Sequence, residues 1–123
     1  MIVKDIMTPV AEVLNGYEYL DRAVLSMKRL GLSRLPVVDH NRIVGILTHQ
    51  NIDIESTLGG WDLTETQVRN AMMAGDMTCS EYLTVDEMTR LLKRMQKSCL
   101  VVLNNEGHAV GIVSEENISG SSV

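Results

Sequence analysis

The apolar and polar positions of this chain follow two periods, one typical of helices and one typical of strands. Apolar residues recur at helical spacing over residues 20–30 and 85–95, which predicts two amphipathic helices that each bury one face. Four short aliphatic runs flank polar turns and predict two hairpins of paired strands. These runs are residues 35–39 with 43–47, and residues 100–103 with 109–113. The pattern therefore predicts a mixed α/β (α+β) fold.

Shorter elements precede each long helix. Residues 3–8 predict a short helix that stops before the next proline, because proline disfavours helical backbone in the residue that precedes it. Residues 10–15 and 77–80 each predict a strand. Residues 64–67 supply a candidate cap for a second short helix, which we expect to end near Met73.

The predicted helix ends carry local signals. Gly31 is a C-terminal stop for the first long helix, and Thr84 with Glu87 forms a capping box at the start of the second. A further helix follows each hairpin. The residues 119–123 are small and polar and do not favour helix, so we expect a frayed tail there.

The chain contains an internal duplication. The octamer Gly45–Ile52 returns in imperfect form as Gly111–Ile118, each with a glycine, two aliphatic residues that end a strand, a hydroxyl, two polar positions and an asparagine that enters a helix. A shift of 65 residues, which becomes 66 after one insertion in the hairpin turn, aligns the two halves over tens of residues. We expect repeat one at 1–56, a Gly-rich connection at 57–63, repeat two at 64–118 and the tail at 119–123.

Composition restricts the classes of function. The 123 residues are 45% hydrophobic, enough for one folded core, and the net charge of −5 argues against nucleic acid or an anionic membrane as the main partner. No apolar run reaches the length of about 20 residues that crosses a bilayer, and the N-terminus lacks the order of a signal peptide. Cys79 and Cys99 match neither a disulfide framework nor a zinc motif, so we expect inert core thiols in a reducing cytoplasm.

Candidate chemistry concentrates in the two repeated octamers. Thr48 and Ser114 lie beside helix-start amides, a setting that suits an anion, but both hydroxyls would serve equally as helix caps. Asn51 and Asn117 have the same two interpretations, as ligand contacts or as helix-start residues. The sequence shows no Ser/His/Asp, Cys/His or paired-carboxylate arrangement that the predicted fold would converge. We therefore expect neither enzyme activity nor a metal centre.

Histidine and tryptophan give weaker signals. His40 and His108 fall in predicted turns, where we expect them to be solvated rather than to bind a metal. His49 follows Thr48 and is the histidine with the stronger case for a functional role. Trp61 lies in the Gly-rich connection, and a large aromatic side chain there needs cover from the domain or from a partner chain.

Three motifs and their spacing indicate a family. Asp5-Ile6-Met7-Thr8 opens the chain, Leu35-Pro36-Val37-Val38-Asp39 forms the first strand of a hairpin, and Gly45-Ile46-Leu47-Thr48 ends the second. Over essentially its whole length the chain resembles the cystathionine β-synthase (CBS) domain pair, in its small stand-alone bacterial form. The resemblance implies two tandem CBS repeats, each a small sheet packed with helices, related by a pseudo-twofold axis. It also implies a homodimer, and clefts between the repeats that bind adenosine compounds.

The resemblance assigns residues to two clefts. In the family, the acid that closes the motif holds the ribose hydroxyls and the Thr or Ser contacts phosphate. One cleft would use Met7, Val10, Leu32, Ser33, Ile112, Ser114 and Asn117. The pseudo-symmetric cleft would use Met72, Lys97, Ser98, Ile46, Thr48 and Asn51.

Both clefts depart from the family pattern at the acid. Asn51 and Asn117 replace the usual aspartate, and losing a charge-assisted hydrogen bond costs on the order of 1 kcal/mol or more. Glu115 and Glu116 follow Ser114 and would repel phosphate. The cleft of Thr48 and Asn51 is therefore the better candidate for a phosphorylated ligand.

Two functional hypotheses follow. In the first, the chain is a regulatory module with no required cofactor. AMP, ADP, ATP or S-adenosylmethionine enters a cleft and shifts the shape of a homodimer or its affinity for an unknown protein target. In the second, the chain is a ligand-free dimerisation or interaction scaffold with degenerate clefts, which the two asparagines and the adjacent acids favour. Stabilisation of the fold by ligand separates the two hypotheses.

Overall fold

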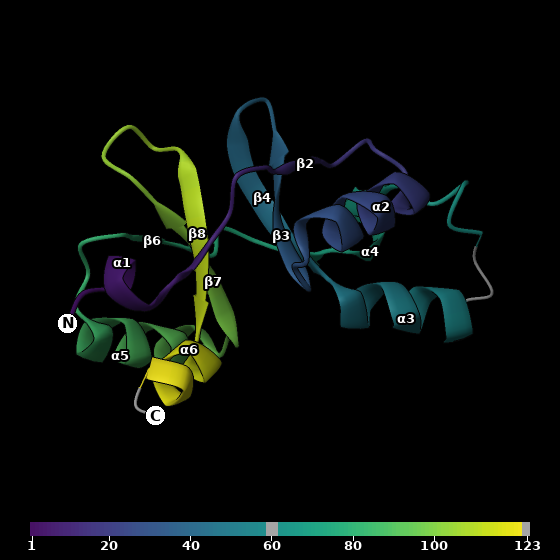
Figure 1. Cartoon of the computed structure of the whole chain (residues 1–123). Helices are drawn as coiled ribbons and strands as arrows, with labels where there is room; N and C mark the ends of the chain where they lie inside the picture. The colour runs from purple at the N-terminus through teal and green to yellow at the C-terminus, as the bar shows by residue number, and fades with distance from the viewer. Residues whose placement is uncertain (59–61, 122–123) are drawn as a thin grey trace. The chain divides into compact units, whose positions relative to one another are not determined.

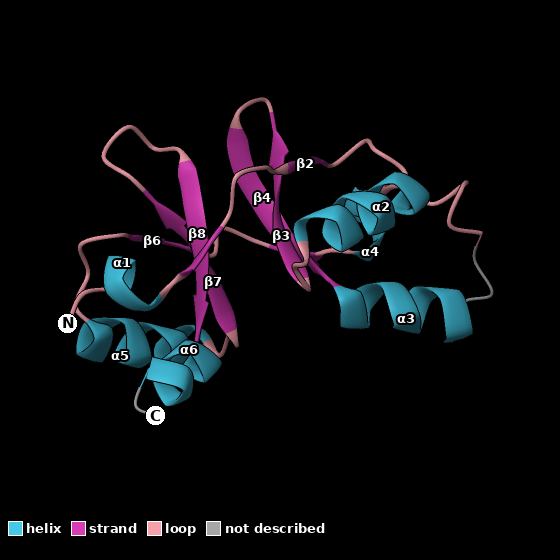
Figure 2. Cartoon of the chain, in the orientation of Figure 1, coloured by secondary structure: helices cyan, strands magenta, loops and turns pink. Residues whose placement is uncertain are grey.

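The computed structural model describes residues 1–58 and 62–121, with side chains for 1–53 and 62–118. Within this part of the chain, helices and strands follow the order expected of a duplicated sequence (Figure 1, Figure 2). The helices are α1 (Val3–Ile6), α2 (Leu20–Leu30), α3 (His49–Leu58), α4 (Val68–Ala71), α5 (Val85–Met95) and α6 (Glu115–Ser121). The strands are β1 (Thr8–Pro9), β2 (Leu14–Asn15), β3 (Arg34–Asp39), β4 (Arg42–Thr48), β5 (Met73–Ala74), β6 (Thr78–Ser80), β7 (Cys99–Leu103) and β8 (Ala109–Ser114). Trp61, for which we expected cover, lies outside the described residues.

The described residues form two compact units that do not coincide with the two halves of the sequence. The central unit is Glu12–Asp76, and the terminal unit combines Met1–Ala11 with the residues from Met77 onward. Each unit contains one four-stranded sheet. The short elements α1 and β1 at the start of the chain thus belong to the unit that the end of the chain builds.

The sheet of the central unit has the strand order β2-β3-β4-β5. The strand β2 is parallel to β3, whereas β4 is antiparallel to both of its neighbours, β3 and β5. The predicted β3–β4 hairpin closes through His40 and Asn41, whose φ angles of 52° and 64° are those of a two-residue turn that matches the twist of the strands. The aliphatic side chains of β3 and β4 form the core, and α3 and α4 both contact β4.

The sheet of the terminal unit repeats this arrangement with the strand order β1-β8-β7-β6. The hairpin of β7 and β8 is also confirmed, and α1 contacts both α6 and β8. Leu103 pairs with Ala109 here, whereas the corresponding residues Val38 and Ile43 pair in the central unit and enclose one residue fewer. The inserted residue therefore lies in the turn of the second hairpin, where Gly107 adopts a φ of 81°.

Each sheet is completed by a segment from the other repeat. We call α1 with β1 the first lead segment, and α4 with β5 the second. The first lead segment places Thr8 opposite Ile112 of β8, and the second places Met73 opposite Ile46 of β4. Each segment thus pairs with the strand that ends in the octamer of the other repeat.

The glycines of the octamers are required by this pairing. A Cβ atom on Gly111 would overlap the sulfur of Met7. A Cβ atom on Gly45 would overlap the carbonyl oxygen of Met73 and lie 2.8 Å from the sulfur of Met72. Glycine is therefore the residue that lets each lead strand approach the sheet so closely.

The two long helices begin and end as predicted. The helix α2 stops at Gly31, whose φ of 68° lies in the left-handed region that glycine tolerates. At the matching position after α5, Gln96 adopts a φ of 54°, although its sequence gives no such signal. Leu20, Met27, Met88 and Leu92 are buried, which confirms the apolar faces expected from the helical period.

Two predictions of short elements differ from the structure. No single strand forms over residues 10–15, because the chain passes there from the terminal unit to the central unit. The helix α4 ends at Ala71 rather than near Met73, because Met73 joins the sheet as part of β5.

Two predictions about helix ends also differ from the structure. Residues 64–67 do not provide a side-chain cap for α4. The N-cap residue is Gln67, whose side chain makes no capping hydrogen bond, and the Thr64 hydroxyl donates to the Oδ1 atom of Asp62 at 2.7 Å. The helix α6 continues to Ser121, beyond the point where its small polar residues predicted an end. Intrinsic propensity is a weak prior, and contacts of α6 with α1 and β8 hold the start of this helix.

No helix in the described part of the chain combines the length and the apolar character required to cross a bilayer.

Alanine substitution at the two octamer glycines should show what each glycine accommodates. We expect Gly111→Ala and Gly45→Ala each to lower the free energy of unfolding by roughly 1–3 kcal/mol through overpacking. Adding Met7→Ala should recover much of the loss at Gly111, because the nearest obstacle there is a flexible side chain. Urea denaturation of the single and double variants measures this coupling.

The matched pair at Gly45 provides the control. Adding Met72→Ala should recover little of the loss at Gly45, because the nearest obstacle there is the backbone carbonyl of Met73. Equal recovery at both glycines would contradict the distinction between a side-chain and a backbone obstacle.

Candidate functional site

The start of α3 in the central unit forms a closed hydrogen-bonded cap. The backbone nitrogen of Asn51 donates to Thr48 Oγ1 at 3.1 Å. The side-chain oxygen of Asn51, Oδ1, accepts from Thr48 Oγ1 at 2.8 Å and from the Thr48 backbone nitrogen at 3.2 Å. This is the geometry of a capping box with asparagine in the place of the usual Glu or Gln. Both residues therefore have the structural role that the sequence left open.

The start of α6 in the terminal unit has a similar cap with an additional function. Asn117 Oδ1 accepts from the Ser114 backbone nitrogen at 2.8 Å and from Ser114 Oγ at 3.2 Å. The side-chain nitrogen of Asn117 then donates to the carbonyl oxygen of Ile6 at 3.0 Å and to Thr8 Oγ1 at 3.1 Å. Asn117 thus ties α6 to the first lead segment. Its side chain joins residues that are 111 positions apart.

The side-chain nitrogen of Asn51 is not used in this way. Among the described residues, it has no hydrogen-bond partner. The counterpart of Thr8 in the second lead segment is Met73, whose side chain has no hydroxyl to accept the bond. The donor beside Ser114 is therefore occupied, whereas the donor beside Thr48 has no partner among the described residues.

The charges near the two helix starts also differ. The first turn of α6 carries Glu115 and Glu116, whereas the first turn of α3 carries no acidic residue. His49 lies in that first turn, with its Nδ1 atom 4.0 Å from a carboxylate oxygen of Asp53. An anion would therefore meet less repulsion at the start of α3 than at the start of α6.

The structure brings together part of each predicted cleft. The terminal unit contains Met7, Val10, Ile112, Ser114 and Asn117, and the central unit contains Ile46, Thr48, Asn51 and Met72. In both units the methionine of the lead segment lies at the octamer glycine and the isoleucine is buried in the sheet. The remaining predicted residues lie in the opposite units: Leu32 and Ser33 in the central unit, and Lys97 and Ser98 in the terminal unit.

Ser33 has a backbone role in the central unit. Its carbonyl oxygen accepts a hydrogen bond from the backbone nitrogen of His49 at 2.9 Å. Ser33, Ser98 and Lys97 are exposed at the beginnings of β3 and β7, so their side chains are accessible to a ligand.

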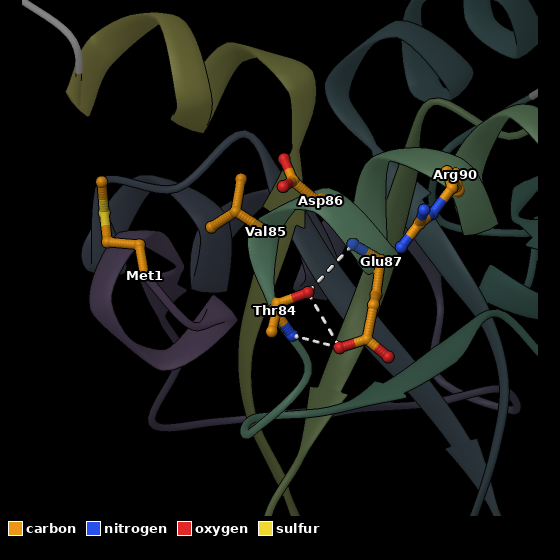
Figure 3. Close-up of a pocket in the computed structure, with 6 residues that line it drawn as sticks. All are labelled: Met1, Thr84, Val85, Asp86, Glu87 and Arg90. Atoms are coloured by element: carbon orange, nitrogen blue, oxygen red, sulfur yellow. Dashed lines mark hydrogen bonds between the residues drawn. The ribbon is translucent and has the colours of Figure 1, made fainter.

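A pocket that the sequence did not predict lies at the start of α5 (Figure 3). It has a volume of about 560 Å³ and is lined by Met1, Thr84, Val85, Asp86, Glu87 and Arg90. The capping box forms one wall: Glu87 donates through its backbone nitrogen to Thr84 Oγ1 at 3.1 Å and accepts from Thr84 in return. The Thr84 hydroxyl lowers the pKa of Glu87. These side chains are engaged with one another, and the pocket shares no residue with the predicted clefts.

Other reactive side chains give no sign of a centre for chemistry. Among the described residues, no group of three or more His, Cys, Asp or Glu side chains lies close enough to hold a metal ion. His40 and His108 are exposed at the hairpin turns, as expected. Cys79 and Cys99 are buried and are not joined in a disulfide, and burial raises the pKa of Cys79 to about 11. The prediction of core thiols is confirmed.

The chain belongs to the CBS domain family. The sequence model of the CBS domain matches residues 3–53 and 68–121, one match for each repeat. This result confirms the predicted family and the two tandem repeats of mixed α/β structure.

Curated relatives include free-standing and fused proteins. The CBS domain-containing protein YhcV of Bacillus subtilis is 25% identical over 112 residues, which are 91% of this chain and 79% of YhcV. Inosine-5'-monophosphate dehydrogenase of Thermoplasma acidophilum is 25% identical over 118 residues, which are 96% of this chain and 22% of the enzyme. The chain spans about a quarter of the length of the enzymes among its relatives.

Solved structures share the fold. The CBS domain pair of protein MJ0100, in complex with 5'-methylthioadenosine and S-adenosyl-L-methionine, has a TM-score of 0.76 and 23% identity, with 99% of this chain and 95% of that chain covered. CBSX2 in complex with AMP has a TM-score of 0.69 and 20% identity, with 98% and 95% covered.

The two asparagines should contribute differently to stability. Asn117→Ala removes the cap of α6 and leaves Ile6 and Thr8 without their donor, so we expect a loss of roughly 2–3 kcal/mol in the free energy of unfolding. Asn51→Ala removes only a cap, for which we expect about 1 kcal/mol. Urea denaturation of both variants measures the difference. Equal losses would show that the contacts to Ile6 and Thr8 contribute nothing.

Burial of Cys79 should make stability depend on pH in the alkaline range. The pKa of this thiol is about 9 when unperturbed and about 11 in the folded protein, so the unfolded chain loses its proton first as pH rises. We expect the free energy of unfolding to be unaffected by Cys79 below about pH 8 and to fall between about pH 9 and 11. The difference between wild type and Cys79→Ala isolates this effect from tyrosine and lysine titration. A difference that does not change with pH would contradict it.

Proposed function

We propose that this chain is a regulatory module that binds an adenine nucleotide or a related adenosyl compound at the start of α3. Thr48 and Asn51 form the centre of this site. The ligand shifts the conformational equilibrium of the protein or its affinity for a protein target. It acts through its different affinities for the two states.

The observation that carries the proposal is the free side-chain nitrogen of Asn51. Both hydrogen bonds that Asn51 Oδ1 accepts are spent on Thr48, so the group left for a ligand is an N–H donor. A donor of this kind binds the oxygen of a hydroxyl or a phosphate. The absence of acidic residues in the first turn of α3 favours a ligand with negative charge.

The ligands of two structural neighbours support the adenosyl class. MJ0100 is in complex with 5'-methylthioadenosine and S-adenosyl-L-methionine, and CBSX2 is in complex with AMP. An adenosine moiety is shared by all three ligands, so this moiety is the part that we assign to the present chain. The group attached to its 5' position is left for experiment.

The family resemblance further implies that Ile46 and Met72 contact the base and that Lys97 and Ser98 belong to the same set of ligand contacts. The repeat boundaries at 1–56 and 64–118 belong to the same proposal. The second cleft would use Leu32 and Ser33 with the residues around Ser114, and we expect it to bind more weakly.

An alternative function is that of a ligand-free interaction scaffold. Every hydrogen bond that the Asn117 side chain makes holds the fold together, and Glu115 and Glu116 lie at the same helix start. These observations favour a cleft whose side chains stabilise the fold and do not bind a ligand. They apply to the terminal unit and leave the donor of Asn51 unexplained.

We also propose that the chain acts as a homodimer. Leu25 on α2 is 66% exposed, and contact with a second copy would remove its apolar surface from water. Neighbours of the family assemble further, since a CBS-CP12 protein of similar fold is hexameric. Light scattering coupled to gel filtration measures the oligomeric state directly.

Calorimetric titration of the purified chain, stripped of nucleotide, tests the ligand. We expect saturable binding of at least one of AMP, ADP, ATP, S-adenosylmethionine and 5'-methylthioadenosine, together with a higher melting temperature. Asn51→Ala should weaken that binding about tenfold, the effect of one lost hydrogen bond of about 1.4 kcal/mol. Asn117→Ala is the matched control and should change the affinity by less than about threefold, measured where both variants are folded.

Two results would reject parts of this proposal. Absence of heat and of thermal stabilisation for all five compounds would leave the scaffold as the better account. Equal weakening by the two asparagine variants would reject the assignment of the ligand to the start of α3.

A further inference from the structure

Residues Met1–Ala11 dock on residues that follow them by many positions. In the terminal unit, the backbone nitrogen of Val3 donates to the carbonyl oxygen of Leu83 at 2.8 Å. The backbone nitrogen of Lys4 donates to the carbonyl oxygen of Glu81 at 2.9 Å. The Val85 nitrogen donates back to Met1 at 3.1 Å. The segment therefore docks along the β6–α5 connection through its backbone.

The same segment docks on β8 and α6 at its other end. Thr8 pairs with Ile112, and the Val10 nitrogen donates to the carbonyl of Val110 at 3.1 Å. The side chain of Asn117 holds both Ile6 and Thr8, as described above. The apolar side chains Val3, Ile6 and Val10 are buried in this unit.

The link from this segment to the rest of the chain is short and weakly held. Ala11, Glu12 and Val13 make no backbone-to-backbone hydrogen bond with any described residue. Ala11 and Val13 are exposed, and Glu12 is anchored on the central unit by its carboxylate, which pairs with both terminal nitrogens of Arg29 at 2.8 and 2.9 Å. The backbone between Val10 and Glu12 therefore connects two segments that are held by different sets of contacts.

We propose that the docking surface for residues 1–11 is also an interaction surface for a second copy of this chain, whose own residues 1–11 occupy it in a reciprocal exchange. The contacts that hold the segment are made with residues from 77 onward, so an identical segment from another copy satisfies all of them. Residues 1–11 of a second copy would need no new interface, because the structure shows the same residues of this chain docked on that surface. Exchange of an identical element is a low-cost route to a dimer.

The second lead segment does not share this property. Residues 68–74 are continuous in sequence with the central unit that they complete, and both of their ends are held in that unit. The first lead segment, in contrast, is held in the terminal unit and continues into the central unit through the short connection at Ala11 and Glu12. In an exchanged dimer the partner copy would supply Met7, Thr8 and Val10 to the helix start of Ser114 and Asn117, so this site is completed by a second chain.

Concentration decides between the two arrangements. A segment tethered by a short link has an effective local concentration of the order of 1 mM. Docking within one chain therefore dominates in dilute solution, and exchange competes when the protein is refolded at about 1 mM. The inference does not depend on the proposed ligand.

A mixed-chain disulfide experiment on the 123-residue chain detects the exchange. One variant carries Thr8→Cys and the other carries Ile112→Cys, because antiparallel partners in a sheet have Cα separations that a disulfide can span. The two are unfolded, mixed, refolded at about 10 µM or about 1 mM, and oxidised. We expect a covalent heterodimer that rises at least tenfold in fraction between the two concentrations, as the balance of intramolecular and intermolecular docking requires.

Two controls keep the test decisive. A chain carrying both substitutions should oxidise within itself when dilute, which shows that the paired positions are bridged, and wild type reports any contribution of the buried native cysteines. The inference is overturned if the double variant oxidises internally while the mixed single variants give no more covalent dimer than wild type at about 1 mM.

Wild-type chains with different isotope labels decide the matter without engineered cysteines. Refolded together at about 1 mM, they should give interchain nuclear Overhauser effects between Thr8 and Ile112. A dimer that lacks these contacts but persists in gel filtration associates through another face, and this result also overturns the exchange.

Discussion

The close pairing of each lead strand across a glycine of the other repeat is the constraint on which the rest of the structure depends. At Gly45 and Gly111 the reason is space and not backbone freedom, because neither glycine has a positive φ. The backbone of the lead strand and a methionine side chain occupy the volume that a Cβ atom would take. As a result, neither half of the duplicated sequence can complete its sheet from its own residues.

The same lead segments determine the chemistry of the two helix starts. Thr8 offers a hydroxyl to Asn117, whereas Met73 at the matching position offers none to Asn51. In both asparagines the side-chain oxygen is committed to the cap, so the side-chain nitrogen is the atom that distinguishes the sites. The duplicated structure thus contains one helix start whose asparagine donor joins distant segments, and one whose asparagine donor has no partner among the described residues.

The local features of this fold were predictable from sequence. The helical period located α2 and α5, Gly31 and the Thr84–Glu87 pair marked two of their ends, and the alternation of apolar and polar residues located both hairpins. The octamers were recognisable as helix starts with a hydroxyl and an asparagine. These signals depend on residues a few positions apart, and backbone geometry relates such residues in the same way in any protein.

Sequence by itself therefore determined the long helices, the two hairpins, the duplication and the family of this protein. Only the tertiary structure decided which sheet each lead segment joins, why the octamers need glycine, and which asparagine has a donor to spare. The strand expected at residues 10–15 fails for the same reason, since the chain changes units there. The contact of Asn117 with Ile6 spans 111 residues and depends on the path of the chain, which no local pattern of side chains records.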